Sequence, residues 1–313
     1  METVKGINEF TQARDGCVLT IGVFDGLHLG HRAVISKARQ LADKRKRELV
    51  LLTFAPGPTE FFTGTDEGFY LMTLDEFQAD LASLGVDRLL LLPFDKQLRG
   101  VGAEDFLLGF VRHRLDARAL VVGEDFSFGR DKMGNIEMVK EMGAKLGLEL
   151  ITIGEVLVDG VPVRSTRLRE MIRDGRIKEA NLLLGYAFYV MGRVGHGQGV
   201  GDSLKCPTAN IEWPHSKVKP RRGVYVVRAT VDGRGYKAVA DFGIRPTITR
   251  GDVEDRLEVH LLDFKGNLEG KEMKVEFLHF LRDEVAFTSK QELADQIVKD
   301  ISDARGLFAA GKF

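Results

Sequence analysis

Short apolar runs alternate with amphipathic stretches through the first half of the chain. Strands are predicted at residues 17–24, 48–54, 87–94, 118–126 and 149–153, and helices at 29–41, 73–85, 103–115, 136–146 and 166–184. Near-continuous Val/Leu strands that alternate with helices are typical of a parallel sheet covered on both faces. The pattern therefore predicts a doubly wound α/β domain whose ligand lies at the carboxyl ends of the strands.

After Gly185 the apolar runs follow one another without helical interruptions. Strands are predicted at residues 187–194, 223–231, 236–243, 255–264 and 271–281. This spacing indicates an antiparallel barrel or sandwich. A length of 313 residues also exceeds what one hydrophobic core usually serves. We therefore expect two domains, residues 1–185 and 186–313.

Local signals refine the second domain. Asp232-Gly233 between two predicted strands indicates a type I′ hairpin, because both central positions of that turn need positive φ. One helix is expected to close the chain. Ser289 with Glu292 forms a capping box at its start, and Leu293, Ile297 and Ile301 are its predicted buried stripe.

Composition excludes several classes of function. The chain is 44% hydrophobic and 29% charged, as in folded globular proteins, and its net charge of −1 supplies no field to hold a nucleic acid. No apolar run approaches the roughly 18 residues of a membrane span, and the start lacks the layout of a signal peptide. The two cysteines, Cys17 and Cys206, fit a reducing compartment. We expect a cytoplasmic protein without nucleic-acid or membrane partners, in which any phosphate site is built locally.

A turn rich in glycine and histidine, GVFDGLHLGH (residues 22–31), directly follows the first predicted strand. Glycines let the backbone approach a ligand, and the start of a helix offers free N–H groups and a positive dipole end to phosphate. His28 and His31 share one face of the starting helix and can grip the same phosphate. A zinc site is the weaker reading, since no third ligand lies nearby in the sequence. An ordinary helix start is the other alternative.

A second stretch suited to phosphate, RSTRLR (residues 164–169), opens the helix after the last strand of this domain. Ser165 or Thr166 can cap the helix, and Arg169 can reach anionic oxygens. Taken alone, such residues are ordinary at helix starts. Two such stretches in one α/β domain favour a phosphate-binding function.

The second domain carries Gly195-His196-Gly197 and then CPTANI (residues 206–211) between its first two predicted strands. The Thr208 hydroxyl and the Asn210 carbonyl are hard oxygen ligands suited to Mg²⁺, which takes few protein ligands and completes its shell with phosphate and water. The alternative is a Pro-Thr turn that leads into an edge strand. Glu258, by itself, reads as a solvated residue on an alternating strand.

These motifs resemble a known family. GVFDGLHLGH and STRLR are similar to the adenylyltransferase half of the bacterial bifunctional riboflavin kinase/FAD synthetase (FMN adenylyltransferase) family, which belongs to the HxGH nucleotidylyltransferases. Further landmarks follow the order of that family: TFAPGP (53–58), PFD (93–95), AEDF (103–106), VGEDFSFG (122–129), PTAN (207–210), GVY (223–225), GIRPT (243–247), LEVH (257–260) and LR (281–282). The resemblance covers nearly the whole chain and implies a nucleotidylyltransferase domain followed by a kinase barrel.

The resemblance implies that riboflavin is phosphorylated by ATP to FMN, and that FMN is then adenylylated by ATP to FAD with release of pyrophosphate. Mg²⁺ would be the cofactor. His28 and His31 would steady the reacting phosphates, and Glu258 would be the base of the kinase. The implied binding residues are Gly22, Phe24, Asp25, Gly26, Ser165, Thr166, Arg169 and Gly197 for ATP, with the pyrophosphate held by Ser165, Thr166 and Arg169; Asp125 and Arg282 for flavin; and Thr208 and Asn210 for the metal.

The sequence departs from the family pattern at six positions. Gly57 replaces a His, Arg164 a Ser, Lys205 a Gly, Cys206 an aromatic residue, Asp241 an Asn and Glu269 a Tyr. Two alternatives therefore stay open, an FMN adenylyltransferase whose kinase-like domain binds flavin but is weak or inactive, and a non-catalytic flavin-binding sensor. The presence of both histidines and of Thr208, Asn210 and Glu258 speaks against the sensor.

Overall fold

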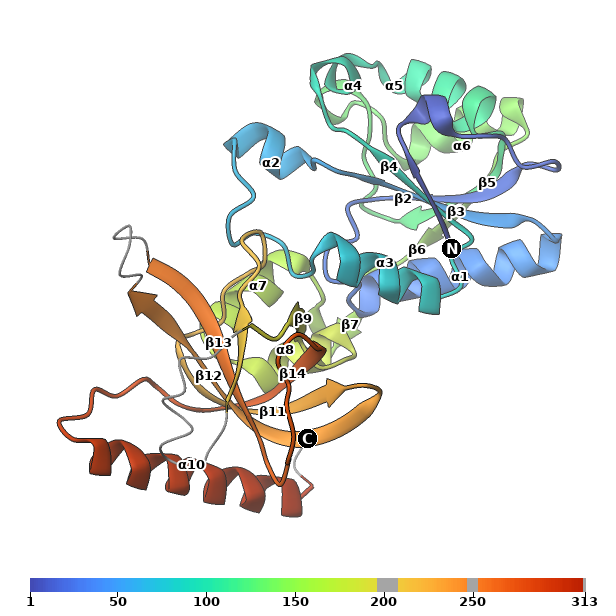
Figure 1. Cartoon of the computed structure of the whole chain (residues 1–313). Coiled ribbons are helices and arrows are strands. Elements are labelled where there is room, and N and C mark those ends of the chain that lie inside the picture. Colours follow the sequence, from blue (N-terminus) through green and yellow to red (C-terminus); the bar gives the residue numbers. More distant parts are fainter. Residues whose placement is uncertain (196–207, 247–252, 312–313) are drawn as a thin grey trace. The chain divides into compact units, whose positions relative to one another are not determined.

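The computed structural model of the chain describes residues 1–195, 208–246 and 253–311. Contacts divide the chain into two compact units, the first of residues 1–66 and 74–164, and the second of residues 67–73 and 165–313 (Figure 1). The second unit thus includes a short segment from the first half of the chain. The predicted boundary after Gly185 separates two functional domains, whereas the two compact units are separated by their contacts. These two divisions need not fall at the same residue, so the boundary after Gly185 stays a prediction.

The first unit is built on a six-stranded parallel sheet in the order β1-β4-β3-β2-β5-β6. Its strands are β1 (Glu2–Lys5), β2 (Cys17–Ile21), β3 (Glu48–Phe54), β4 (Arg88–Leu92), β5 (Ala117–Gly123) and β6 (Glu149–Ile153). The prediction of a parallel α/β sheet is confirmed. β1 was not predicted, because its four residues carry too short a pattern and only pairing with β4 makes them a strand.

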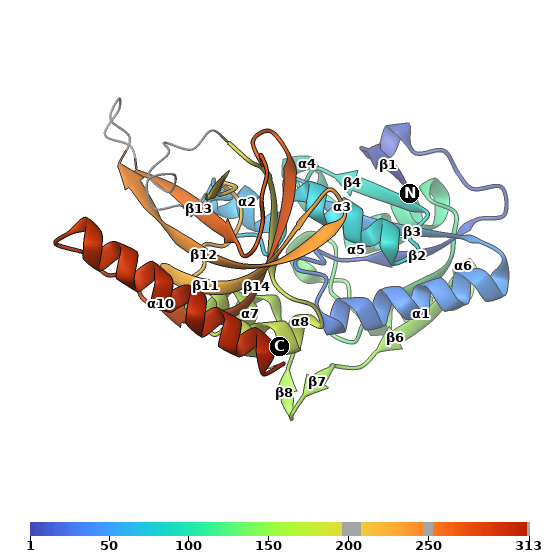
Figure 2. The ribbon, with the colours of Figure 1, turned by 60° about the horizontal axis from the view of Figure 1, so that its bottom comes forward.

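Helices cover both faces of this sheet (Figures 1 and 2). On one face lie α1 (Leu29–Arg45) and α3 (Leu74–Ser83), which are joined by an ion pair of 3.5 Å between Arg32 and Asp80. On the other face α5 (Ala103–Asp105), η2 (Phe106–Arg114) and α6 (Ile136–Leu146) pack against alternate residues of the strands in one apolar cluster. The connections contain η1 (Ile7–Glu9), α2 (Pro58–Thr63), α4 (Lys96–Gly100), η3 (Arg130–Lys132) and the hairpin of β7 (Leu157–Val158) and β8 (Val161–Pro162).

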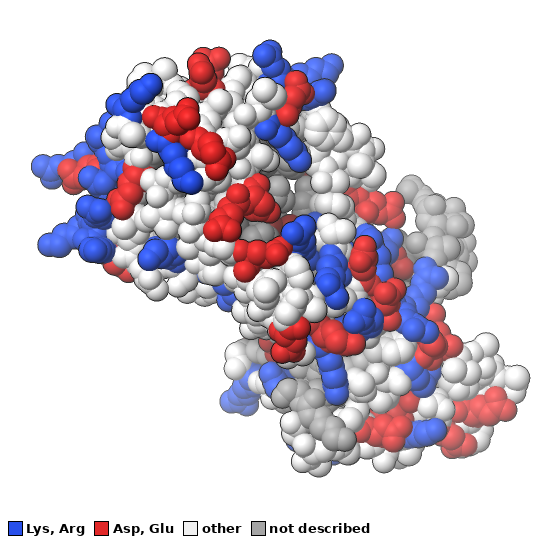
Figure 3. Space-filling view, turned by 180° about the vertical axis from the view of Figure 1, so that it is seen from behind, with Lys and Arg blue, Asp and Glu red and all other residues white. Residues whose placement is uncertain are grey.

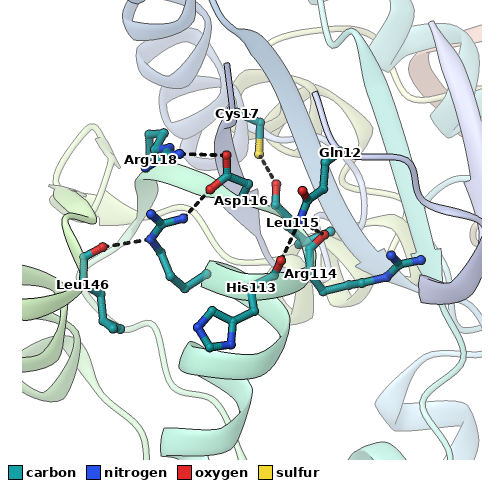
Figure 4. Close-up of polar contacts among 9 residues, drawn as sticks. Gln12, Cys17, His113, Arg114, Leu115, Asp116, Arg118 and Leu146 are labelled. Atoms are coloured by element: carbon teal, nitrogen blue, oxygen red, sulfur yellow. Dashed lines mark hydrogen bonds and ion pairs between the residues drawn. The ribbon is translucent and has the colours of Figure 1, made fainter. Parts of the chain in front are cut away.

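The helix predicted at 103–115 changes type along its length. Beyond α5 it is a π-helix, which the bond from Leu115 N–H to the Phe110 carbonyl at 2.9 Å continues. Asp116 fixes its carboxyl end by accepting from Arg112 and, at 3.0 Å, from Arg118 (Figure 4).

Cys17 of β2 lies beside the carboxyl end of η2. Its thiol donates to the Leu115 carbonyl at 3.4 Å, and burial raises the pKa of the thiol to about 12 (Figure 4). The thiol therefore stays protonated at neutral pH, which makes it a packing group rather than a nucleophile.

The second unit contains a six-stranded antiparallel sheet in the order β10-β13-β12-β11-β14-β9. Its strands are β9 (Tyr189–Arg193), β10 (Ala209–Glu212), β11 (Gly223–Val231), β12 (Arg234–Pro246), β13 (Val253–Leu261) and β14 (Glu272–Arg282). Gly195 N–H donates to the Asn210 carbonyl at 2.8 Å, so the two edge strands meet and the sheet nearly closes. Of the two predicted alternatives, the barrel is confirmed. Strand β10 is the edge strand that the sequence analysis considered only as an alternative interpretation of the CPTANI stretch.

Within the described residues, three helices accompany the barrel. α7 (Ser165–Arg173) and α8 (Ile177–Leu184) precede it in the chain, and the Asn181 side chain of α8 donates to the Phe277 carbonyl of β14 at 2.9 Å. α10 (Lys290–Ala309) follows the barrel and is the predicted closing helix.

The hairpin turn and the helix cap predicted in the second domain are both present. Asp232 and Gly233 have φ of +50° and +75°, which confirms the predicted hairpin turn. The Ser289 hydroxyl accepts from the Glu292 N–H at 3.2 Å and caps α10 as predicted. The three residues of the predicted buried stripe, Leu293, Ile297 and Ile301, are all half-buried, and of these Ile301 packs against the core cluster. The helix packs on the sheet with its carboxyl-terminal half, where Ala304, Leu307 and Phe308 extend the contact.

Basic and acidic side chains are interspersed on the face drawn in Figure 3. Among the described residues, no helix combines the length and the apolar character that crossing a membrane requires.

Candidate active sites

The turn predicted to bind nucleotide leaves the carboxyl end of β2, at the point where the strand order of the sheet reverses. From β2 the chain proceeds to β3 and β4 on one side, and it later places β5 and β6 on the other side. Gly22 and Gly123 follow directly on the last core positions of β2 and β5. Such a switch point is where open α/β sheets bind their ligands.

The backbone of this turn is held in an unusual conformation. Phe24, Gly26 and Leu27 all have positive φ, of 52°, 83° and 37°. Positive φ costs roughly 1–2 kcal/mol at a residue other than glycine. The turn is fastened by bonds from the Thr53 hydroxyl to the Val23 carbonyl at 3.1 Å and from Leu27 N–H to the Phe24 carbonyl at 3.1 Å. Strain held in place by surrounding bonds is a mark of functional turns.

The two histidines are brought together as the sequence predicted. His28 is the N-cap of α1, its Nδ1 accepts from His31 N–H at 3.4 Å, and the two rings stack with centroids 3.6 Å apart. Because Nδ1 of His28 accepts, Nε2 is the ring nitrogen suited to donate to an anion. A Cβ on Gly30 would stand 3.2 Å from the His28 ring, which explains the glycine between the histidines.

His31 is electrically distinct from an exposed histidine. Burial, and then the neighbouring His28, lowers the pKa of His31 well below its usual value. The imidazole is therefore neutral at pH 7. Its Nδ1 is buried and has no hydrogen-bond partner within the described part of the chain. An unsatisfied buried ring nitrogen is costly in the protein alone and is a bonding position for a ligand.

Asp125 is exposed just beyond the end of β5. Nearby, Arg164 donates to Glu155 at 2.6 Å and 3.1 Å, and Glu155, followed by Asp125, raises the pKa of Arg164. The arginine that replaces the family's serine is therefore held by a carboxylate partner. Gly57, where the family has His, is the N-cap of α2 and makes no side-chain cap.

The second predicted phosphate stretch lies on α7, in the second unit. Ser165 is half-buried and Thr166 exposed in the first turn. Arg169 is only 8% exposed, and its Nε donates to the Phe69 carbonyl at 2.7 Å. The structure therefore places these three residues together on one helix, with the arginine already anchored on one side.

An aromatic cluster near the end of β3 was missed by the sequence analysis. Phe54, Phe61 and Phe62 surround Phe94, with ring centroids between 5.5 Å and 6.0 Å from its ring. Phe62 is 63% exposed, and the guanidinium of Arg99 lies 5.3 Å from its ring. An exposed ring on a packed aromatic base is suited to stacking a planar ligand. The Phe-Phe pair shortly after a predicted strand was the signal that could have revealed it.

In the barrel, the register of five strands aligns one row of residues. Asn210 of β10 lies opposite Glu258 of β13, Glu258 lies opposite Asp241 of β12, and the row continues through Val224 of β11 to Arg282 of β14. Residues directly opposite one another in antiparallel strands project on the same face. The structure thus brings the predicted base beside a predicted metal ligand.

Asn210 is the most deeply placed polar residue of this row. It is 5% exposed, and its Oδ1 has no hydrogen-bond partner among the residues that the structure describes. Thr208, half-buried, lies just before β10. A buried amide oxygen without a partner, next to a carboxylate, fits the hard-oxygen preference of Mg²⁺. Gly197, Lys205 and Cys206 lie outside the described residues.

The side chains of Asp241 and Arg282 lie in different electrostatic surroundings. Asp241 is solvent-exposed, yet the surrounding protein removes enough water to raise the pKa of the carboxyl to about 6, and the charges of Glu284 and Glu258 add to the rise. Arg282 donates from Nε and Nη2 to the buried Asp300 at 2.9 Å and 2.7 Å, and from Nη1 to the Asp283 carbonyl at 2.9 Å. Arg282 therefore fastens α10 to β14, and its predicted contact with flavin stays a prediction.

A doubly wound domain with a histidine-capped turn at its switch point, joined to a nearly closed barrel with an Asn-Glu row, is the architecture expected of the two-domain family that the motifs resemble. Comparison with known proteins agrees for each half: the model of the FAD synthetase family matches residues 10–167, and that of the riboflavin kinase family matches residues 184–308. The chain belongs to the bifunctional riboflavin kinase/FMN adenylyltransferase family.

Individual relatives resemble the chain along its whole length. The bifunctional riboflavin kinase/FMN adenylyltransferase of Pseudomonas fluorescens is 37% identical over 309 residues, covering 99% of this chain and 98% of the relative. The protein of the same description from Escherichia coli K12 is 35% identical over 316 residues, covering 100% and 99%. A crystal structure described as a macrolide-efflux protein from Streptococcus pneumoniae has 30% identity and a TM-score of 0.88, with 97% of this chain and 99% of that chain covered.

The raised pKa of Asp241 predicts a pH-dependent effect of Asp241→Asn on stability. The folded chain holds this proton up to about pH 6, whereas the unfolded chain loses it near the ordinary value of 3.8. Ionisation of Asp241 therefore costs stability as pH rises from about 4 to 6, and the cost is complete above that range. Asp241→Asn should raise the thermal unfolding temperature at pH 7.5 and have less effect at pH 4. The gain should be about 1 kcal/mol or less, since solvent screens an exposed carboxylate. An equal gain at both pH values would contradict the assignment.

Proposed function

We propose that the two sites carry out the two reactions of the family in separate domains, residues 1–185 for adenylyl transfer and residues 186–313 for phosphorylation. The chain is an enzyme with riboflavin kinase and FMN adenylyltransferase activities. Riboflavin, FMN, FAD and ATP are accordingly its substrates and products. The stacked His28–His31 pair supports the first site, and the pairing of Glu258 with Asn210 supports the second.

In adenylyl transfer, an FMN phosphate oxygen forms a bond to the α-phosphorus of ATP as the bond to pyrophosphate breaks. No covalent intermediate with the enzyme is needed, so catalysis rests on positioning and on neutralising charge. His28 donates from Nε2, and the buried Nδ1 of His31 gains a partner that the described residues do not supply. The turn residues Gly22, Phe24, Asp25 and Gly26 would border the same nucleotide.

The departing pyrophosphate is assigned to α7 of the second unit. Ser165 and Thr166 lie in its first turn, where helix N–H groups and the dipole favour anions. Arg169 adds a full positive charge one turn further along. The family resemblance and the residue types support this part of the proposal.

The flavin of adenylyl transfer is assigned to two groups of the first unit. Asp125, just after β5, lies at the switch point and would face the flavin phosphate or ribityl side. The exposed Phe62 offers a face on which the flavin ring system can stack.

In the kinase reaction, Glu258 takes the proton of the riboflavin 5′-hydroxyl as that oxygen bonds to the γ-phosphorus of ATP and ADP leaves. Thr208 and Asn210 would hold Mg²⁺, which when bound neutralises charge on the nucleotide phosphates. Asp241 lies directly opposite Glu258 on the neighbouring strand, so a second carboxyl group borders the proposed base. Assigning Arg282 to flavin requires a contact made while its guanidinium also holds Asp300.

The adenylyltransferase assignment predicts that the double variant His28→Ala/His31→Ala loses FAD formation. The rate of FAD synthesis from FMN should fall at least about 100-fold, because two groups that touch the phosphates are removed. FMN formation from riboflavin should be unchanged. His113→Ala, a histidine of the same unit at the end of η2, is the matched control and should leave both rates near wild type. Chromatographic assay of both products decides, and near-normal FAD synthesis by the double variant would sink the assignment.

The kinase assignment predicts the converse pattern for Glu258→Gln and Asn210→Ala. Riboflavin phosphorylation should fall at least about 100-fold, since the base or the metal ligand is lost, while added FMN is still converted to FAD. Glu212→Gln, an exposed carboxylate on the same strand as Asn210, is the control and should retain both activities. If either site variant lost both activities together, the change would report a folding defect or shared chemistry.

The flavin assignment predicts that Phe62→Ala raises the KM for FMN in adenylyl transfer by roughly tenfold. The stacking face is lost, whereas the groups that hold ATP are untouched, so the KM for ATP should change little. Phe62→Tyr keeps the ring and should restore the wild-type value. Steady-state kinetics with FMN and ATP varied separately test this, and an unchanged KM for FMN in Phe62→Ala would place the flavin elsewhere.

A further inference from the structure

A seven-residue segment of the first half of the chain is built into the second unit. Residues 67–73, here called the strap, lie between α2 and α3 in sequence but group with residues 165–313. Gly68 N–H donates to the His215 carbonyl at 2.9 Å, Tyr70 N–H to the Ser216 carbonyl at 2.8 Å, and Val218 N–H to the Tyr70 carbonyl at 2.7 Å. The strap therefore pairs with residues 215–218 as a short strand would.

A buried lysine anchors the strap. Lys217 is 1% exposed, and its Nζ donates to the Leu71 carbonyl at 2.9 Å. The rings of Phe188 and Tyr189 lie 5.1 Å and 5.6 Å from the same ammonium. A buried ammonium is tolerated only where acceptors and ring faces replace its water. The position of the strap is thus tied to the placement of a buried charge.

The strap also fixes the arginine that the proposed function assigns to pyrophosphate. Nε of Arg169 donates to the Phe69 carbonyl at 2.7 Å, and its guanidinium carbon lies 3.9 Å from the centre of the Phe69 ring. Phe69 therefore contacts both the edge and the face of the Arg169 guanidinium, through its carbonyl and its ring. Arg173, one turn further along α7, donates to the Gly68 carbonyl at 3.1 Å. A free arginine side chain samples many rotamers, and ordering it when a ligand binds costs entropy. An arginine that is already held in place binds the ligand without that cost.

We propose that Phe69 is a positioning residue for FMN adenylyl transfer, which holds the Arg169 guanidinium in the orientation that binds the pyrophosphate part of ATP. The inference rests on the role proposed for Arg169. Arginine binds phosphate through a planar fork, so the direction of its plane matters as much as its charge. Neither the phosphate motifs nor the family resemblance includes Phe69, which acts only through the arginine that it touches.

The test varies the ring while the full-length chain is kept. Phe69→Leu removes the ring face and keeps an apolar side chain, and Phe69→Tyr keeps the ring. Adenylyl transfer is measured forward with ATP and FMN and in reverse with FAD and pyrophosphate. For Phe69→Leu we expect the KM values for ATP and pyrophosphate to rise by roughly tenfold, with kcat and the KM for FMN changed less than about threefold. Phe69→Tyr should match the wild type, and riboflavin phosphorylation should be unaffected in both variants.

A second pair of variants tests the strap without touching Phe69. Lys217→Met removes the anchor of the Leu71 carbonyl, and the KM for pyrophosphate should rise as in Phe69→Leu. Hydrogen exchange of the Gly68, Tyr70 and Val218 amides should become faster in this variant. Glu67→Gln is the matched control, because Glu67 of the strap binds Lys219 at 3.0 Å in an exposed ion pair that contributes little, while Lys219 keeps its ion pair with Asp255 at 2.8 Å. It should change neither the exchange nor the KM.

Arg169→Ala separates failure of this inference from failure of the proposed function. If this variant leaves the KM values for ATP and pyrophosphate unchanged, the anion role of Arg169 is wrong and the inference falls with it. If Arg169→Ala raises both values and Phe69→Leu does not, the positioning role is overturned while the proposed function stands. A loss of kinase activity and thermal stability in Phe69→Leu that equals its loss of adenylyl transfer would make Phe69 a purely structural residue and would also overturn the inference.

Discussion

Hydrogen-bond register between neighbouring strands is the constraint on which both sites depend. In the first unit, parallel pairing of β2 with β3 and β5 sets the carboxyl ends of these strands at one edge, from which the histidine turn and Asp125 emerge. In the second unit, antiparallel register sets Asn210, Glu258 and Asp241 side by side on three strands. A side chain is fixed only as well as the backbone that carries it, so register decides which groups can act together.

The electrostatics of the chain are local. With a net charge of −1, the protein has no overall field to gather anions, and each charged group is tuned by its immediate surroundings. Burial keeps His31 neutral, packing and neighbouring carboxylates raise the pKa of Asp241, and carbonyl and ring contacts hold the buried Lys217. Two predicted site atoms, Nδ1 of His31 and Oδ1 of Asn210, are buried without a partner in the described parts of the chain. Unsatisfied polar atoms are kept where a ligand supplies the missing bond.

The path of the chain brings together residues that belong to different sequence motifs. Helix α2 carries the exposed Phe62, the loop that follows it carries the strap, and the strap holds Arg169 of α7. Residues of the first half thus complete the polar contacts of a helix that groups with the second half. The residues matched by the two family models consequently differ by several short segments from the residues of the two compact units.

The sequence by itself determined most element types, the order of the two domains and the places of the two motifs interpreted as phosphate-binding, because hydrophobic periodicity, caps and turn residues act over a few neighbouring positions. It also indicated that His28 and His31 share a face, since residues three positions apart on a helix do so wherever the helix lies. Only the tertiary structure decided that β1 and β10 are strands, because each is a short segment that depends on a distant partner. The row of Asn210, Glu258 and Asp241, the engagement of Arg282 with Asp300, and the docking of the strap on Arg169 and Lys217 join residues far apart in the chain. Such pairings are set by register and packing over the whole fold, which no local pattern encodes.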